Sequence, residues 1–144
     1  MKSLDTNILL YASNTAAPEH EKALLLVNEM LARPTEWILA DQILWELYTA
    51  LRHPKILEKP RTAVQAAAQI RFLREQSGVA FCAYEISQFP EVLTRLDMPR
   101  FPYQRTFDTV MAVTLHYHGV KIFYTRNGKD FAGAGFDEVI NPID

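Results

Sequence analysis

The sequence predicts an α/β fold, a three-layer α/β/α sandwich around a central parallel sheet of four to five strands. Short apolar segments that suit buried strands alternate along the chain with longer segments whose apolar residues recur at helical spacing. The 144 residues, 49% of them hydrophobic, are enough for a domain with its own core. No internal repeat, low-complexity tract or long linker divides the sequence. We therefore expect a single domain over residues 1–144.

The expected strands are short apolar runs. They lie at residues 1–4, 37–40, 79–83 and 120–124, with a last short one at 139–140. The apolar residues 8–10 continue the first run into a helix or turn. Because helices separate the strands in sequence, the strands are expected to run parallel, with helices on both faces of the sheet. In such sheets, ligands lie beyond the carboxyl ends of the strands.

The expected helices combine apolar residues at helical spacing with recognisable ends. They cover residues 18–31, 43–51, 62–76, 89–96 and 107–118. Pro18 suits the first turn of a helix. Asp41 and Thr106 are expected to cap the helices that follow them. Gly78 and Gly119 are expected to end the helices that precede them.

Charge and cysteine content limit the classes of function. A net charge of -2 gives no general attraction to nucleic acid, so such binding must depend on a local patch. The single cysteine, Cys82, excludes an internal disulfide and a cysteine-based zinc site, and it fits a reducing, cytoplasmic setting. No apolar run reaches the roughly 18 residues of a membrane span, and no signal peptide is visible. We expect no membrane partner.

Four acidic residues lie near the ends of expected elements. Asp5 follows the first strand, Glu46 lies in an apolar helix, Asp108 lies in a first helical turn, and Asp130 follows the fourth strand. They are far apart in sequence and can meet only through the fold. Clustered carboxylates repel one another unless a proton or a cation neutralises them. Oxygen donors suit Mg²⁺ or Mn²⁺, and such sites hydrolyse phosphodiesters.

Each of these acids also has an ordinary structural explanation. Asp5 can be a turn or cap residue, and Glu46 can belong to a solvated helix face. Asp108 can complement a helix dipole, and Asp130 can be a loop acid. If all four are of this kind, the protein is a catalytically silent α/β binding module.

Four segments together resemble PIN-domain ribonucleases, and specifically the VapC-type toxins of bacterial and archaeal toxin–antitoxin systems. They are LDTNILLYA at 4–12, ILWELYTALRHP at 43–54, TFDTVMAVTLHYHGVKIFYT at 106–125 and NGKDF at 127–131. The tail GFDEVINPID at 135–144 is also similar to the end of that family, so the resemblance spans essentially the whole chain. It implies a PIN-like fold and a metal-dependent endoribonuclease, the toxin of a type II toxin–antitoxin system. An RNA-processing PIN nuclease without an antitoxin is the alternative.

The resemblance also implies roles for individual residues. Asp5, Glu46 and Asp108 match the catalytic acids that hold Mg²⁺ or Mn²⁺, and Asp130 matches a position where many members carry a further acid. Many relatives have an acid where this chain has Asn127, so the fourth catalytic acid is either absent or supplied by Asp130. The residues expected to orient the site are Asn7, Thr6, Thr125 and Asn127.

Basic residues near these acids are candidates for contact with RNA phosphates. Arg126 and Lys129 lie beside the site in sequence. Arg100 and Arg105, in the loop before Asp108, are further candidates, with ordinary surface charge as the alternative.

The resemblance implies three partners. They are an RNA substrate, a cognate antitoxin that inserts a segment into the active-site groove, and a second copy of the chain in a homodimer. The apolar helical faces over 23–31 and 43–51 are rich enough to leave surface for such a dimer, although periodicity does not separate that use from core packing.

Overall fold

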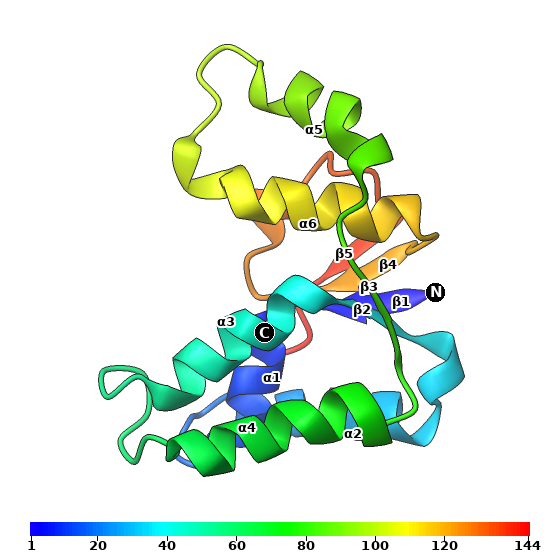
Figure 1. Cartoon of the computed structure of the whole chain (residues 1–144). Coiled ribbons are helices and arrows are strands. Elements are labelled where there is room, and N and C mark those ends of the chain that lie inside the picture. Colours follow the sequence, from blue (N-terminus) through cyan, green and yellow to red (C-terminus); the bar gives the residue numbers. More distant parts are fainter.

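The computed structural model describes all 144 residues, and they form a three-layer α/β/α sandwich (Figure 1). Its strands are β1 (Lys2–Leu4), β2 (Ile38–Ala40), β3 (Ala80–Cys82), β4 (Ile122–Tyr124) and β5 (Glu138–Ile140). The pairs β1–β4, β4–β5 and β2–β3 are all parallel. An isolated parallel bridge between Lys2 and Trp37 joins the two sets, which gives the order β3-β2-β1-β4-β5. The predicted parallel sheet is confirmed.

Six α-helices cover the sheet. They are α1 (Thr6–Ser13), α2 (His20–Ala32), α3 (Asp41–Arg52), α4 (Ala63–Arg71), α5 (Phe89–Leu96) and α6 (Thr106–Tyr117). A π-helical turn continues α4 to Gln76. Helices α5 and α6 lie on one side of the sheet, and α1, α2 and α4 lie on the other (Figure 1). None of the helices has the length and apolar character that a membrane span needs.

Local sequence explains where most of these helices begin and end. Thr62 and Gln65 form a reciprocal capping box at the start of α4. Gly78, at φ +81°, follows the π-helical turn, in the left-handed conformation that glycine adopts without strain. The apolar residues 8–10 belong to α1, so the first strand ends at Leu4. Helix α2 begins at His20, two residues beyond Pro18.

The predicted capping roles of Asp41 and Thr106 are wrong. Ala40 is the N-cap of α3, and Asp41 is already the first helical residue. Arg105 is the N-cap of α6, while the Thr106 hydroxyl donates backward to the Tyr103 carbonyl at 2.7 Å. In both cases the chain leaves the extended or turn conformation one residue earlier than the capping preference suggests.

The core fixes how α3 presents its polar face. Ile43, Leu47 and Leu51 are fully buried, so the apolar stripe of α3 packs inward and the intervening residues lie at its edges. The predicted apolar face of α2 is likewise mostly core, with Leu25 as an exposed exception. The stripes over 23–31 and 43–51 are therefore used mainly for folding, and Leu25 and Trp45 are their large exposed apolar residues.

Candidate active site

Asp5 is the residue around which the site is built. Its backbone N–H donates to the Tyr124 carbonyl at 2.9 Å, which extends the pairing of β1 with β4. Its side chain caps α1 by accepting from the Thr6 N–H at 2.8 Å. The second carboxylate oxygen accepts from the Thr125 hydroxyl at 2.8 Å and from the Asn7 amide at 3.5 Å. Asp5 is only 6% exposed, so these contacts hold a buried carboxylate in one orientation.

Thr125 is the fully buried residue that orients Asp5 from the end of β4. Its N–H donates to the Ile140 carbonyl at 2.9 Å, and its hydroxyl oxygen accepts from the Asn127 N–H at 3.0 Å. The hydroxyl proton therefore points to Asp5. The exposed side chain of Asn127 makes no hydrogen bond, so Asn127 contacts the site only through its backbone.

Glu46 reaches the site from α3 and is held on both oxygens. The Thr6 hydroxyl donates to one oxygen at 3.3 Å, and the Gln42 amide donates to the other at 2.7 Å. The same amide donates to the Phe107 carbonyl at 3.2 Å, at the start of α6. Gln42 thus ties α3 to α6 and was missed by the sequence analysis. Its spacing of four residues before Glu46, on one helix face, is the signal that indicates such a contact.

Burial and neighbouring acids raise the pKa of Asp5. Desolvation is the largest cause, and together with the charges of Glu46 and Asp130 it raises the pKa of Asp5 from 3.8 to about 6. The hydrogen bonds from Thr125 and Thr6 oppose this rise because they stabilise the ionised form. The remaining rise shows that hydrogen bonding does not compensate fully for burial.

Asp108, in the first turn of α6, lies in the same electrostatic environment. Desolvation is the largest cause, and together with the charges of Asp5, Glu46 and Asp130 it raises the pKa of Asp108 from 3.8 to about 6. The nearby Arg105 guanidinium has the opposite effect. The fold therefore brings together all four acids that the sequence analysis selected, although they come from four separate segments of the chain.

Asp130 is the one acid of the four with an ion-pair partner. It lies in the turn Gly128–Phe131, and its carboxylate is 3.1 Å from the Arg105 guanidinium. The sequence predicts Arg105 as a phosphate contact. In the structure, the ion pair with Asp130 uses part of the hydrogen-bonding capacity of its guanidinium. Arg100 lies exposed in the preceding loop, with φ +66°.

The two other basic candidates differ in their surroundings. The Arg126 guanidinium lies over the Tyr11 ring, 5.2 Å from its centroid, and 3.4 Å from Glu19. It is thus held against α1 and α2, while its backbone N–H donates to the Asn7 side chain at 3.4 Å. Lys129 is exposed and forms no ion pair, so its ammonium is free to meet a ligand.

The donor set suits a hard divalent cation, but the carboxylates do not form a closed cage. No three acidic, histidine or cysteine side chains lie close enough together to hold a metal ion by themselves. Mg²⁺ is usually held by one or two carboxylates, with water and phosphate oxygens completing its shell. The carboxylates of Asp5, Glu46 and Asp108 form no direct ion pair, and they suit that more open requirement.

The parallel sheet, with Asp5 after β1 and Asp130 after β4, is an arrangement that comparison with known proteins assigns to a class. The chain matches the PIN domain family over residues 3–137, and it belongs to that family. It is 36% identical over 143 residues to Ribonuclease VapC24 of Mycobacterium tuberculosis, from both strain CDC 1551 / Oshkosh and strain H37Rv. This similarity covers 99% of the chain and 97% of the relative.

Solved structures show the same fold at lower identity. The VapC20 toxin of M. tuberculosis, described as cleaving the sarcin–ricin loop, superposes with a TM-score of 0.65 at 18% identity, over 94% of this chain and 96% of that one. FitAcB from Neisseria gonorrhoeae gives 0.67 at 15% identity, over 99% and 98%. FitAB bound to an IR36 DNA fragment gives 0.68 at 14%, over 100% and 96%.

Proposed function

We propose that this protein is a metal-dependent endoribonuclease that hydrolyses RNA phosphodiester bonds, and that it is the toxin of a type II toxin–antitoxin system. The observation that carries the proposal is the cluster of four acids, in which burial and mutual repulsion raise the pKa values of Asp5 and Asp108. Full-length similarity to a named ribonuclease of the PIN family supports RNA as the substrate.

Asp5, Glu46 and Asp108 would hold the cation, Mg²⁺ or Mn²⁺, with Asp130 as the fourth acid. A bound divalent cation would supply the positive charge that offsets these carboxylates, activates water and stabilises charge developing on the phosphate. The chain's own part is to fix the carboxylates: Thr125 orients Asp5, and the pair of donors on Glu46 fixes that side chain.

The basic residues would contact the RNA backbone. Lys129, exposed and without an ion pair, is available for a phosphate next to Asp130. Arg126 would first have to exchange its contact with Glu19, whose side chain is only 22% exposed, for a phosphate.

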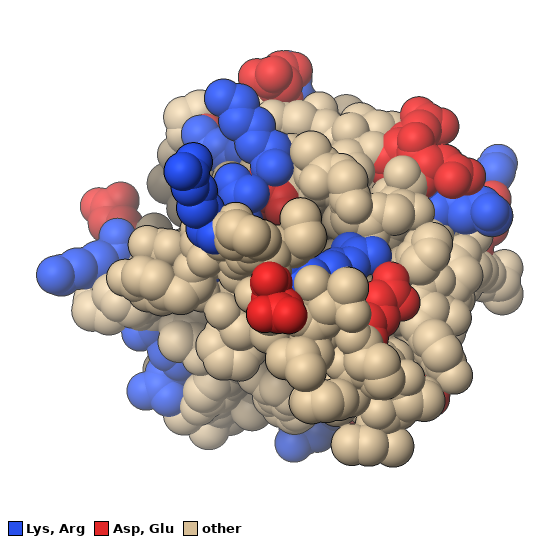
Figure 2. Space-filling model, turned by 90° about the horizontal axis from the view of Figure 1, so that it is seen from above, with Lys and Arg blue, Asp and Glu red and all other residues tan.

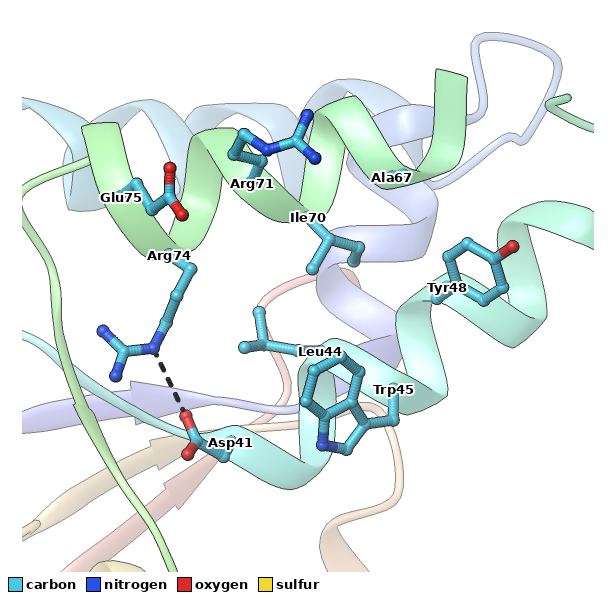
Figure 3. Close-up of a pocket in the computed structure, with 9 residues that line it drawn as sticks. All are labelled: Asp41, Leu44, Trp45, Tyr48, Ala67, Ile70, Arg71, Arg74 and Glu75. Carbon is cyan, nitrogen blue, oxygen red and sulfur yellow. Dashed lines mark ion pairs between the residues drawn. The ribbon is translucent and has the colours of Figure 1, made fainter. Parts of the chain in front are cut away.

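An antitoxin segment is the partner we propose for the groove between α3 and α4. Figure 3 shows Leu44, Trp45 and Tyr48 of α3 facing Ile70 of α4 across a cavity of about 380 Å³. Trp45 is 64% exposed there, and the rim carries basic side chains. These are Arg71 and Arg74, the second of them paired with Asp41 at 3.6 Å. Asp41 and Glu75 line the same groove, so its apolar side chains rather than a net charge favour an amphipathic segment, which would lie on the helix that carries Glu46.

We place the homodimer contact on the α5 side of the molecule rather than on α2 or α3. Ile86, Phe89, Leu93 and Tyr117 are apolar or aromatic side chains that are 49% or more exposed there. Figure 2, which views this side, shows broad uncharged surface between scattered charged groups. Apolar surface of this kind is typical of obligate interfaces. A cytoplasmic setting is also proposed, supported by the unpaired Cys82.

The test is cleavage of a panel of single-stranded and structured RNAs by the purified protein, with Mg²⁺, with Mn²⁺ and with EDTA. We expect metal-dependent cleavage that is lost in Asp5→Asn, while Asp137→Asn, an exposed acid paired only with Lys121, retains it. Cleavage unaffected by EDTA or by Asp5→Asn would contradict the proposed site. Absence of both cleavage and calorimetric metal binding would favour a silent binding module.

The toxin role has a separate test. Induced expression should arrest bacterial growth for the wild type and not for Asp5→Asn. Co-expression of a small protein encoded beside this gene should restore growth. Cleavage without growth arrest would favour an RNA-processing nuclease.

A further inference from the structure

A second cavity opens directly beside the acids, on the side of α6 that faces α5. It measures about 380 Å³ and is bounded by α5, the loop that follows it, α6 and residues 130–134. Asp108 and Asp130 belong to its wall. Its contents would therefore be continuous with whatever occupies the acid cluster. Its volume lies within the roughly 300–1,000 Å³ typical of ligand pockets.

The cavity exists because small residues line one side of it. Ala112, Ala132, Gly133 and Ala134 leave this wall without bulky side chains, and Phe101 provides an aromatic wall elsewhere. Gly133, at φ +76°, has open space where a Cβ would point.

Arg95 pins this turn in place. Its guanidinium donates to the Ala134 carbonyl at 2.9 Å and to Glu91 at 3.0 Å. The cavity is thus part of the fixed fold on this side, because a charged side chain from α5 bonds directly to its backbone.

The hydrogen bonds that the polar groups in the cavity wall already make determine whether each can donate to a ligand or accept from it. The Thr109 hydroxyl donates to the Arg105 carbonyl at 2.8 Å, and the Thr94 hydroxyl donates to the Pro90 carbonyl at 2.8 Å. Both hydroxyls therefore offer only lone pairs to a ligand. Arg105 uses one amino group on Asp130 and retains further N–H donors. A ligand would meet arginine donors together with hydroxyl and carboxylate acceptors.

We propose that this cavity is a subsite for a guanine base of the RNA, next to the scissile phosphate. RNA is read mainly through unstacked bases that lie against aromatic or arginine planes and are bonded on their edges. Guanine combines two acceptors, O6 and N7, which suit arginine, with the N1–H and N2–H donors, which suit hydroxyl or carboxylate oxygens. Cytosine and adenine lack the O6 acceptor and the N1–H donor. This inference rests on the proposed function, since it names a substrate contact of the same site.

The direct test is a nucleotide titration of ¹⁵N-labelled protein followed by NMR, which requires no cleavage. Guanosine monophosphate should shift the amide signals of residues 94–101, 109 and 132–134 in a saturable way. Cytidine monophosphate should bind at least fivefold more weakly, and inorganic phosphate alone should leave the signals of 132–134 unchanged. Equal shifts from the guanine and cytosine nucleotides, or shifts confined to other regions, would overturn the proposal.

Matched variants connect the cavity with the binding. Ala132 is an exposed residue that lines the cavity, so the larger side chain of Ala132→Leu should fill part of it. The variant should weaken guanosine monophosphate binding at least tenfold. Ala68→Leu places the same side chain on the exposed face of α4 and should change nothing. Wild-type affinity in Ala132→Leu would refute the subsite.

A cleavage assay then separates this inference from the proposed function. On RNAs that differ only at the base flanking the cut, the wild type should favour guanine, and Ala132→Leu should lose that preference while still cutting. Metal-dependent cleavage that is indifferent to the base would refute the subsite and leave the nuclease intact. Absence of both cleavage and calorimetric metal binding, with guanine binding intact by NMR, would refute the nuclease and leave a nucleotide-binding cavity.

Discussion

The substitution Asp5→Asn should stabilise the metal-free protein at alkaline pH. Folding raises the pKa of Asp5 from 3.8 to about 6, so the folded state binds this proton more tightly than the unfolded state does. The resulting stability is fully present below pH 4 and is lost as pH rises through about 6. At pH 8 the ionised carboxylate costs roughly 3 kcal/mol, at about 1.4 kcal/mol for each pH unit.

The variant should gain most of that cost. An asparagine amide at this position can still accept from the Thr6 N–H, and it replaces the neutral form of the carboxyl. The cost already includes the opposing hydrogen bond from Thr125. We therefore expect Asp5→Asn to exceed the wild type by about 2–3 kcal/mol at pH 8, and to lie close to it at pH 4.

Urea unfolding in EDTA at pH 4, 6 and 8 measures this difference, with the fluorescence of the fully buried Trp37 as signal. Asp137→Asn, at an exposed acid, is the control and should follow the wild type at each pH. Added Mg²⁺ should raise the stability of the wild type and not of Asp5→Asn. A variant that is less stable than the wild type at pH 8 would refute the account of Asp5 as an uncompensated buried charge.

Three further substitutions test the packing around the site. Thr125→Val should cost about 1–3 kcal/mol in urea unfolding and lower the rate of RNA cleavage, because it leaves Asp5 without its buried donor; Thr125→Ser should recover most of both. Gln42→Ala should lower cleavage at least tenfold with little change in unfolding, because it frees Glu46 at the surface; an unchanged rate would remove Gln42 from the site. Leu47→Ala should cost about 2–5 kcal/mol, measured by urea unfolding, without changing the metal dependence of cleavage, because it opens a cavity in the core.

The sequence predicts helices and strands well where the spacing of apolar residues agrees with the residues that begin or end an element. The helix expected over 89–96 has the bounds of α5, and the five expected strands coincide with β1–β5 to within two residues. The errors lie at boundaries that tertiary contacts decide. Asp41 suits a cap by residue type, yet its side chain turns to Arg74 instead. A capping preference of about 1 kcal/mol is small enough for such a contact to override.

The candidate site likewise combines residues that the sequence predicts with contacts that only the fold creates. Residue type and position make the four acids candidates, but each also has an ordinary structural explanation, and the resemblance to PIN-domain ribonucleases is what favours a metal site. Contacts across the fold are not encoded in local spacing. Gln42 bonds to a carbonyl 65 residues away, and Arg105 meets an acid beyond β4. Such pairs become visible only when the strands set α3, α6 and the last turn side by side.

The charge balance among the acids gives them different roles. Asp130 has an arginine 3.1 Å away, whereas Asp5, Glu46 and Asp108 form no ion pair with any basic residue. The fold supplies hydrogen bonds to Asp5 and Glu46, which fix their direction without cancelling their charge. A compensating arginine would stabilise the folded chain at neutral pH, but it would also occupy the space of a cation. The three acids that form no direct ion pair are therefore the ones we assign to the metal, and Asp130 could join them only if Arg105 moved away from it.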